Sequence, residues 1–427
     1  MNPKKQIPSQ DSKSLIFVSY FSGIDGMVMS EWVEDKLLVA ESQYPKTYLI
    51  TSFAGKDRIR ANVRVFKVPS LSWKDYSWEL CEYARNNRSK SKVLTIWYPI
   101  AATFGRFWDV AFSKISTNSA ARWSWGFTAL PVALCIRILS GSSKLFATGG
   151  ATGGHLVGLL TNLITKVPLF LEFQDPLLGS EMVRSNLNSK LISKFEGFFI
   201  SKSTRTVFVT QQAARASIER HPKFSEKIAH IYPGAWNFPV TQQVQKVSEN
   251  QFIEILHLGT LYGARNLDNF FIALDRLKHS GYNNADRVRV KNLGDIYLEN
   301  KSNYLIRPDF ETLPSRARTL ALLRALESDA LLLVQHADAR SSETIPYKTF
   351  DYLNLGKPII GMIYNPELEA LLNNDKYFLA DATSVESIQT SLGEFLTNFD
   401  LIQNFSNQAK SDFKIERQFE RIFECYE

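Results

Sequence analysis

Short apolar segments rich in β-branched and aromatic residues alternate with longer helix-like stretches along the whole chain. Each short segment is almost continuously apolar, which is typical of parallel strands covered by helices on both faces. The pattern therefore predicts two doubly wound α/β domains. The predicted strands are Leu15–Tyr20, Thr47–Phe53, Val63–Val68, Val93–Trp97, Lys144–Thr148, Pro168–Phe173, Thr206–Thr210, Ile228–Tyr232, Phe252–Gly259, Val288–Leu293, Ala330–Val334, Pro358–Ile363 and Tyr377–Ala380.

The chain has 427 residues, which is too long for one hydrophobic core. The Gln-rich stretch 236–250 shows no apolar periodicity and is the best linker candidate. We expect Rossmann-like domains at 1–235 and 236–405. A polar helical segment at 406–427 is expected to pack across one of them.

Three cysteines are widely spaced, so neither a disulfide framework nor a zinc site is expected. The N-terminus is polar and lacks the apolar core of a signal peptide. The apolar stretches at 125–138 and 157–173 are expected to be too short, or interrupted by Lys166, to cross a bilayer. These features predict a cytoplasmic protein.

Positive charge is concentrated in the first half. Residues 1–235 contain 30 Lys and Arg against 17 Asp and Glu, whereas residues 236–427 contain 20 against 26. A basic half with many tryptophans suits an anionic membrane surface, a lipid-linked phosphate or a nucleic acid. The segment Arg122-Trp123-Ser124-Trp125 is the candidate contact for a peripheral membrane association. Alternatively, the Lys and Arg residues form an ordinary solvated surface and the tryptophans belong to the core.

The strongest candidate for chemistry is the segment 341–358, SSETIPYKTFDYLNLGKP. We expect a loop, a helix that begins near Pro346 and is capped by Thr344 or Ser342, and a stop at Gly356. Free N–H groups at a helix start suit a phosphate. Glu343 would lie in the loop and Asp351 about two turns inside the helix. Alternatively, the two acids are ordinary surface residues.

A second candidate is the segment 257–266, HLGTLYGARN, between a predicted strand and a predicted helix. A glycine-bearing turn allows backbone N–H groups to approach a phosphate, and a nearby cation neutralises it. Arg265 is the candidate cation. Taken alone, two glycines four residues apart also occur in ordinary turns.

Together these segments resemble the donor signature of retaining GT-B glycosyltransferases of the family-4 type. The resemblance rests on Glu343, seven intervening residues and an acid, with a Pro-x-Lys-x-x-acid-Tyr core. It implies that Glu343 contacts the donor hexose and that Asp351, where the family usually has Glu, holds the ribose. Arg265 and Lys348, with the helix start that includes Thr344 and Ile345, would bind the diphosphate.

In the second segment, Gly259 matches a family glycine, but Thr260 replaces the family's arginine. The resemblance further implies that the terminal helix crosses back to the first domain, which would bind the acceptor. It predicts hexosyl transfer with retention from a UDP- or GDP-sugar to a cell-surface glycan or a lipid-linked acceptor. We expect no cofactor and no required metal.

Three further sites lie in the first half. Gly23 and Gly26 follow the first strand, in a loop that would face the cleft. The four-glycine stretch 148–154 is expected to be a flexible loop that exposes its backbone, with His155 as a candidate catalytic residue. Gln174 and Asp175 end the strand at 168–173 and are also candidate catalytic residues; Gln174 stands where many members of the family have His. Alternatively, the loop with Gly23 and Gly26 is a tight turn without a ligand, and His155 is a structural residue.

Two other functions remain open. A nucleotide-sugar epimerase could have the same fold, although it would need acids and bases about the sugar and no acceptor site. The sequence pI of about 9.1 admits a nucleic-acid-binding protein, but no RNA- or DNA-binding signature occurs, so we expect no nucleic acid as a partner.

Overall fold

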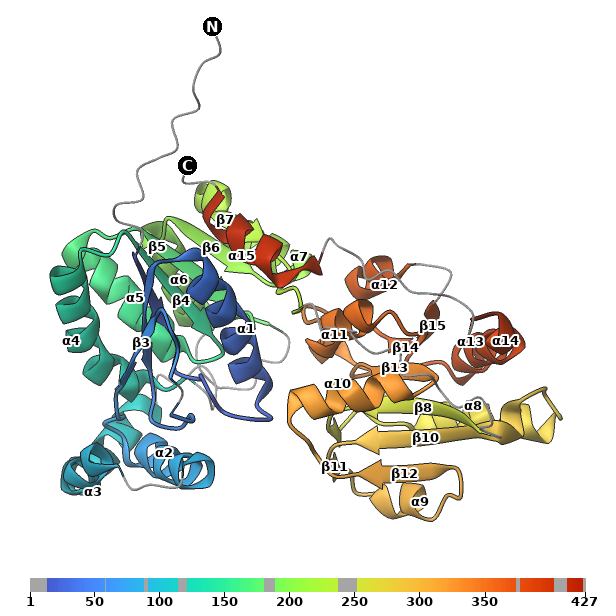
Figure 1. Ribbon diagram of the computed structural model, residues 1–427. Helices are drawn as coiled ribbons and strands as arrows, with labels where there is room; N and C mark the ends of the chain where they lie inside the picture. Colours follow the sequence, from blue (N-terminus) through green and yellow to red (C-terminus); the bar gives the residue numbers. More distant parts are fainter. Residues whose placement is uncertain are drawn as a thin grey trace, which may run out of the picture.

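The computed structural model describes residues 14–57, 59–87, 91–113, 121–179, 189–236, 252–373, 377–402 and 413–424. These residues form two α/β halves side by side, each built on a parallel sheet with helices on both faces (Figure 1). The first sheet has the strand order β3-β2-β1-β4-β5-β6-β7, and the second has the order β12-β10-β8-β13-β14-β15. The prediction of two doubly wound domains is confirmed.

The first half contains β1 (Ser14–Val18), α1 (Val28–Gln43), β2 (Lys46–Thr51), β3 (Val63–Lys67), α2 (Trp73–Asn86), α3 (Lys92–Ser113), α4 (Trp123–Ser140), β4 (Lys144–Gly149), α5 (Thr152–Thr165), β5 (Leu169–Phe173), α6 (Ser189–Lys202), β6 (Arg205–Phe208), α7 (Gln211–Arg220) and β7 (Ile228–His230). Because β4 and β5 lie inside the sheet, nearly all their side chains are buried. This burial explains why their sequences are largely apolar.

The second half contains β8 (Ile253–Leu258), α8 (Asp268–His279), β10 (Val288–Leu293), α9 (Lys301–Leu305), β12 (Phe310–Leu313), α10 (Arg318–Glu327), β13 (Ala330–Val334), α11 (Lys348–Leu355), β14 (Ile359–Ile363), α12 (Pro366–Leu372), β15 (Tyr377–Asp381), α13 (Val385–Thr397) and α14 (Phe399–Ile402). A small sheet pairs β9 (Leu261–Tyr262) with β11 (Ile296–Tyr297). The short strands β9, β11 and β12 were not predicted from the sequence.

The predicted strand Val93–Trp97 is wrong, because these residues belong to α3. The β-branched and aromatic residues there favour a strand locally. The apolar positions continue at 96, 100, 104 and 107, however, which is a helical spacing. A 22-residue helix results, with Pro99 inside it.

The terminal helix α15 (Ile415–Phe423) follows the second half in the sequence but packs against the sheet of the first half (Figure 1). Ile415, Phe419 and Phe423 share a core with residues of β1, β4 and β5, including Phe146 and Phe170. The expected linker at 236–250 and the expected boundary at 405 fall almost entirely outside the described residues. The domain limits therefore stay predictions.

Helix α4 is long and apolar enough to cross a membrane, judged by length and composition. The expectation that this stretch is too short is corrected, because the apolar run extends over Trp123–Ser140. About two fifths of it (39%) is buried inside the protein, where it packs beside α5. A core helix meets the same criteria, so this property alone does not indicate a membrane span.

Helix α2 is attached to the carboxyl edge of the first sheet through Glu79. The Glu79 carboxylate is buried and accepts hydrogen bonds from the Tyr20 hydroxyl (2.9 Å) and from the Ser70 backbone N–H (3.1 Å). Burial raises the pKa of Glu79 to about 7, although these hydrogen bonds oppose the shift. The folded protein therefore binds a proton between about pH 4.3 and 7 that the unfolded chain releases.

We expect Glu79→Gln to change the pH dependence of stability. In the wild type, ionising Glu79 in the folded state costs free energy, so the free energy of unfolding should fall as pH rises from about 4.5 to 7. The difference from Glu79→Gln should change over this window by up to about 3 kcal/mol. Urea unfolding of both proteins at several pH values measures it. A constant difference across the window would contradict the assignment.

Candidate active site

A polar cluster lies at the carboxyl edge of the second sheet, where the strands end. The His257 Nδ1–H, at the end of β8, donates to Asn292 Oδ1 of β10 (2.6 Å). Because Asn292 Nδ2 donates to the Gly294 carbonyl, its oxygen must be the acceptor here. His257 Nε2 is then free to accept from Lys348 Nζ, at 2.6 Å. Lys348 Nζ also donates to the Leu258 carbonyl (2.9 Å).

The electrostatics of this cluster favour an incoming anion. Burial lowers the pKa of Lys348 well below its usual range, and the neighbouring Arg265 guanidinium lowers it further. Burial likewise lowers the pKa of His257, with Lys348 as the next cause, so His257 is neutral. The charged form of Lys348 is therefore disfavoured in the free protein, and a phosphate bound beside it would favour that form.

Gly259 leaves its backbone open beside this cluster. Its φ of +123° is a conformation that side chains rarely adopt, and a Cβ placed there would lie 3.7 Å from Lys348 Nζ. Gly294 packs so tightly on this turn that its own Cβ would come within 2.5 Å of the Gly259 carbonyl oxygen. The two glycines thus let the β8 and β10 loops meet below an open, cation-lined turn.

Arg265 belongs to the same turn. Its backbone exchanges two hydrogen bonds with Tyr262 (both 3.0 Å), and its guanidinium lies 5.3 Å from the centre of the Tyr262 ring. Thr260, which precedes β9, is partly exposed. The structure therefore places Gly259, Thr260 and Arg265 in one turn beside Lys348, and their roles in binding a diphosphate stay predictions.

Glu343 lies where the two halves meet. Its backbone carbonyl accepts from the Thr210 hydroxyl of the first half (2.8 Å), and its Oε2 is buried. A Cβ added at Gly179, in the loop after β5, would lie 3.5 Å from that oxygen. Burial raises the pKa of Glu343, and no hydrogen-bond partner for Oε2 occurs among the described residues.

The loop that carries Glu343 is held from both sides. Asn365 Nδ2 donates to the carbonyls of Ser341 (3.0 Å) and Thr344 (3.2 Å), and Gln335 Nε2 also donates to Thr344 (3.3 Å). These bonds hold the backbone of the loop from which the Glu343 side chain extends.

Gln174 follows β5 and leads into the loop that Glu343 approaches. Its side chain is only 4% exposed, yet neither its oxygen nor its nitrogen has a hydrogen-bond partner within the described ranges. A buried primary amide without partners is costly, so a polar group that paired with it would be stabilised there. The neighbouring Asp175 is exposed.

Asp351 has a partner that the sequence analysis did not anticipate. Its two carboxylate oxygens accept from Arg318 (2.6 and 3.2 Å). The same guanidinium donates to both oxygens of Asp35 on α1 (2.7 and 2.8 Å). Tyr347 donates to Asp35 as well. Asp351 therefore joins an ionic network between the two halves; burial raises its pKa and Arg318 lowers it.

The start of α11 differs from the prediction. The helix begins at Lys348 rather than near Pro346, and no side chain caps it. Thr344 and Ser342 instead donate to the backbone carbonyls of Arg340 (3.2 Å) and Ala339 (2.8 Å). Ile345 is buried in the core, so its side chain is packed rather than presented to a ligand.

The glycine loops of the first half are packed closely. A Cβ at Gly150 would lie 2.0 Å from Met29 Sδ, and one at Gly153 would lie 2.3 Å from the Arg122 carbonyl oxygen. The expected flexible, backbone-exposing loop at 148–154 is thus wrong, because these glycines allow buried backbone contacts. Gly23 also packs, against Lys56, whereas Gly26 is exposed and a Cβ there would meet none of the described atoms within 4 Å.

His155 is fully buried. Its Nε2 contacts the Glu172 backbone carbonyl (2.7 Å), and its ring stacks on Phe173 with centroids 4.4 Å apart. Burial lowers the pKa of His155. These contacts give it a structural role; its proposed catalytic role stays a prediction. Glu172, whose side chain pairs with the buried Lys36 (3.0 Å), was missed because it lies inside an apolar run.

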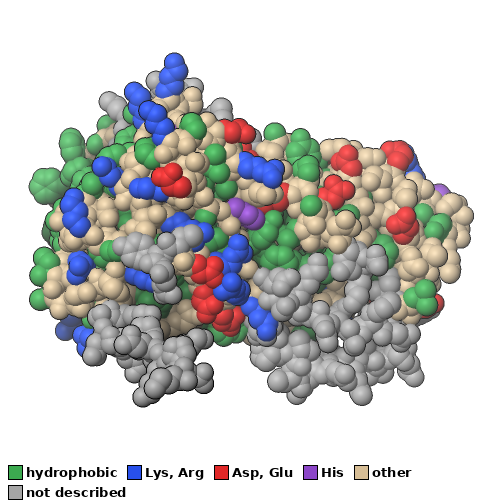
Figure 2. Space-filling model, turned by 90° about the horizontal axis from the view of Figure 1, so that it is seen from above, with side chains coloured by type: hydrophobic (Ala, Val, Ile, Leu, Met, Phe, Trp, Pro, Cys, Tyr) green, Lys and Arg blue, Asp and Glu red, His purple; other side chains and the backbone are tan. Residues whose placement is uncertain are grey.

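The candidate membrane contact at 122–125 is wrong. Trp125 is fully buried and donates to the Val68 carbonyl, and Trp123 is almost fully buried. Arg122 pairs with Asp75 (2.5 Å) and stacks over Trp78. The aromatic residues of this segment therefore build the core. On the face drawn in Figure 2, Lys and Arg side chains nevertheless gather mainly over the first half, and Asp and Glu over the second.

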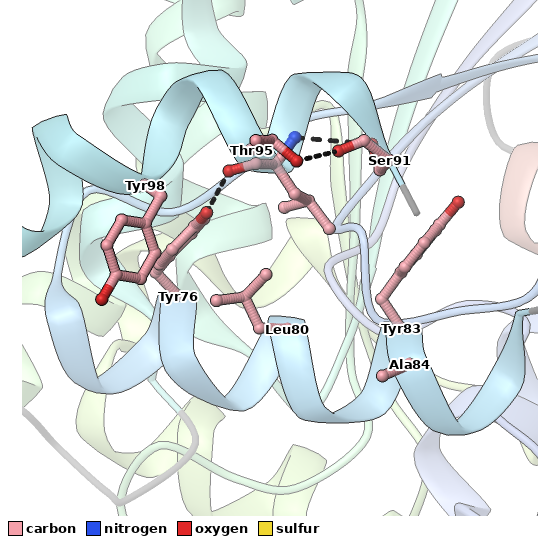
Figure 3. A pocket seen from close by; sticks show the side chains of 8 residues that line it. Tyr76, Leu80, Tyr83, Ala84, Ser91, Thr95 and Tyr98 are labelled. Atoms are coloured by element: carbon pink, nitrogen blue, oxygen red, sulfur yellow. Dashed lines mark hydrogen bonds between the residues drawn. The ribbon is translucent and has the colours of Figure 1, made fainter. Parts of the chain in front are cut away.

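A separate pocket of about 320 Å³ lies between α2 and α3 (Figure 3). Aromatic and aliphatic side chains line most of it, and it contains none of the predicted donor-site residues. The lining residues are Tyr76, Leu80, Tyr83, Ala84, Ser91, Leu94, Thr95 and Tyr98. No group of three or more metal-ligating side chains occurs in the described part of the chain.

No protein-family model and no curated protein matches the sequence. Solved structures do match. HepE from Anabaena, in complex with UDP and glucose, is 14% identical with a TM-score of 0.55, and 97% of this chain and 99% of that chain are covered. A glycosyltransferase from Rickettsia africae is 12% identical (97% and 98% covered, TM-score 0.59). A sucrose-phosphate synthase from Thermosynechococcus elongatus is 8% identical (97% and 98% covered, TM-score 0.60).

Proposed function

We propose that this protein is a glycosyltransferase that takes a hexosyl group from a UDP- or GDP-sugar. The chain has the two-domain GT-B fold of the solved structures that it matches. The observation that carries the proposal is the partly buried Lys348–His257 pair beside the open Gly259 turn. In this reaction the nucleoside diphosphate is the leaving group, so cations that stabilise its charge lower the barrier. HepE, which has the same fold, was solved with UDP and glucose.

Each site residue then has a separate task. Lys348 and Arg265 neutralise the diphosphate, and the Gly259 backbone allows it to approach. Glu343 positions the transferred hexose, while Gln174 donates or accepts a hydrogen bond but moves no proton. Asp351 accepts from the ribose hydroxyls through the lone pairs that Arg318 leaves open. We further propose retention at the anomeric carbon, as the family resemblance implies.

The acceptor belongs to the first half. We propose that a glycan or a lipid-linked acceptor enters from the carboxyl edge of the first sheet, where Gln174 and the loop up to Gly179 lie. The apolar α2–α3 pocket is at the same edge and offers room for a non-polar part of such an acceptor (Figure 3). Polysaccharide biosynthesis is the corresponding role.

An epimerase is the second candidate, because the fold is shared by a protein from Listeria monocytogenes assigned as a UDP-N-acetylglucosamine 2-epimerase (10% identical, TM-score 0.52). Epimerisation needs groups that move protons about the sugar. Gln174 carries no titratable proton, which favours transfer. NMR of a nucleotide sugar incubated without acceptor separates the two: a second epimer would support the epimerase, whereas UDP release that requires added acceptor supports the transferase.

We expect Asp351→Ala to weaken free nucleotide and nucleotide sugar alike, by about tenfold, since both contain the ribose and one charge-assisted hydrogen bond is lost. Asp351→Glu should be tolerated. Calorimetric titration with UDP and GDP measures both variants.

Asp35→Ala is the matched control for this prediction, because it removes the other carboxylate of Arg318 without touching the predicted ribose site. Its nucleotide affinity should stay close to that of the wild type. An equal loss in Asp35→Ala and Asp351→Ala would show that the network between the halves, and not the ribose contact, sets the affinity.

A further inference from the structure

Helix α3 presents an apolar stripe to solvent along most of its length. Ile96, Phe104, Phe107 and Val110 are 71%, 61%, 68% and 62% exposed, and Val93 and Ile100 continue the same face. These positions follow a helical spacing, so they form one continuous surface rather than scattered single residues. Contiguous exposed apolar surfaces of this kind are typical of interaction sites.

The opposite face of α3 is fixed to the protein. Leu94 and Ala101 are buried, and Gly105 packs so closely that a Cβ there would lie 2.6 Å from the Trp73 backbone nitrogen. The Tyr76 hydroxyl of α2 donates to the Leu94 carbonyl (Figure 3), and Trp97 Nε1 donates to the Ser70 carbonyl (2.9 Å). The helix therefore cannot turn its apolar stripe inward without breaking these contacts.

The exposed charged side chains around the stripe are mainly positive. Lys74, Arg85, Lys92 and Arg106 are exposed on α2 and α3. In the sequence, Arg85, Arg88, Lys90 and Lys92 follow one another within eight residues directly before the apolar stretch.

Most carboxylates of the same two helices are buried or paired within the protein, whereas Asp109 is partly exposed. Asp75 pairs with Arg122, Glu79 is buried against Tyr20 and Ser70, and Asp109 accepts from the Lys74 backbone N–H (3.1 Å). Glu82, which pairs with Arg85, is also buried. The surface beside the apolar stripe is therefore predominantly cationic among the described residues, which complements an anionic layer and not a neutral protein groove.

The helix that carries the stripe lies at the carboxyl edge of the first sheet. The contacts of α2 and α3 with Tyr20 and Ser70 follow the carboxyl ends of β1 and β3. In a parallel sheet this is the edge at which β5 ends and Gln174 begins. A surface that docked α3 would therefore lie beside the mouth of the candidate site.

We propose that α3 docks this protein on an anionic lipid surface. Its stripe of Ile96, Ile100, Phe104 and Phe107 enters the boundary between headgroups and acyl chains, and the cations on α2 and α3 contact the lipid phosphates. The proposal is independent of the donor chemistry, because it concerns binding alone. It replaces the incorrect contact at 122–125 with a surface that the structure exposes.

The test is flotation of the full chain with phosphatidylcholine vesicles prepared with and without phosphatidylglycerol. The wild type should float with the anionic vesicles, and part of this binding should persist at high salt because the apolar contribution is not screened. Phe104→Ser/Phe107→Ser should lower the partition coefficient by about tenfold or more. Leu305→Ser/Ile306→Ser, which changes two exposed apolar residues of the second half, should float like the wild type.

Light scattering coupled to gel filtration identifies the alternative occupant, a second copy of the chain. A wild-type dimer that the Phe104→Ser/Phe107→Ser variant dissociates would overturn the proposal. So would equal flotation of the two double variants, or a wild type that does not float with anionic vesicles at low salt. Nucleotide binding is unaffected by any of these outcomes, so the donor proposal is tested separately.

Discussion

Glu343→Gln should reduce sugar transfer at least about 100-fold while the affinity for free UDP or GDP stays within about twofold of the wild type. The carboxylate positions the hexose, and an error in positioning is expressed mainly at the transition state. Free nucleotide has no hexose and does not reach this side chain. The measurements are turnover with saturating donor and calorimetric affinity for the nucleotide.

The geometry makes Glu343→Gln a clean substitution. Thr210, Gln335 and Asn365 hold the loop through backbone carbonyls, so the amide keeps the shape of the site. Glu369→Gln, an exposed carboxylate on α12, serves as the matched control and should transfer sugar normally. Full activity in Glu343→Gln would remove this residue from the site, and a parallel loss of nucleotide affinity would indicate a structural defect.

Lys348→Met should weaken UDP binding by roughly 10- to 100-fold, since charge-assisted hydrogen bonds to the diphosphate are lost. Lys348→Met should also abolish the proton uptake that accompanies nucleotide binding in the wild type. In the free protein, burial and Arg265 lower the pKa of Lys348, whereas a bound diphosphate would raise it. The complex then binds more protons than the free protein, so affinity should fall as pH rises through the pKa of free Lys348.

Calorimetry in buffers of different ionisation enthalpy measures this proton uptake directly. Arg265→Ala provides the second arm. It should weaken binding as well, but it removes a charge that lowers the pKa of Lys348, so its proton uptake should be smaller than that of the wild type. Unchanged affinity in both variants, or identical proton uptake in the wild type and Lys348→Met, would contradict the assignment of this turn to the diphosphate.

The fold could be predicted largely because its strands are buried on both faces. Continuous apolar runs such as Ala330–Val334 can be recognised as strands without knowledge of their neighbours. The same rule failed at Val93–Trp97, where the apolar stretch is part of a helix that exposes its apolar side. An isolated sequence window contains no information about which face the rest of the protein covers.

Some residues of the candidate site could be predicted from local sequence, and others could not. Gly259, Arg265, Lys348 and Glu343 could be proposed because they lie in local strand-to-helix turns. The partner of Asp351 could not, because Arg318 lies 33 residues away and also binds Asp35, 283 residues away. His257 lies within the predicted segment 257–266, but its role depends on Asn292, which belongs to the neighbouring strand.

The central claim is that the second half binds a nucleotide sugar at the Lys348 turn. Thermal unfolding with a panel of UDP-, GDP- and ADP-sugars tests it without any acceptor, since a ligand at 100 times its Kd stabilises the folded state by about 2.7 kcal/mol. We predict that at least one UDP- or GDP-sugar raises the Tm of the wild type by several degrees and has little effect on Lys348→Met. A panel in which no nucleotide sugar raises the Tm, or in which Lys348→Met responds like the wild type, would contradict the account.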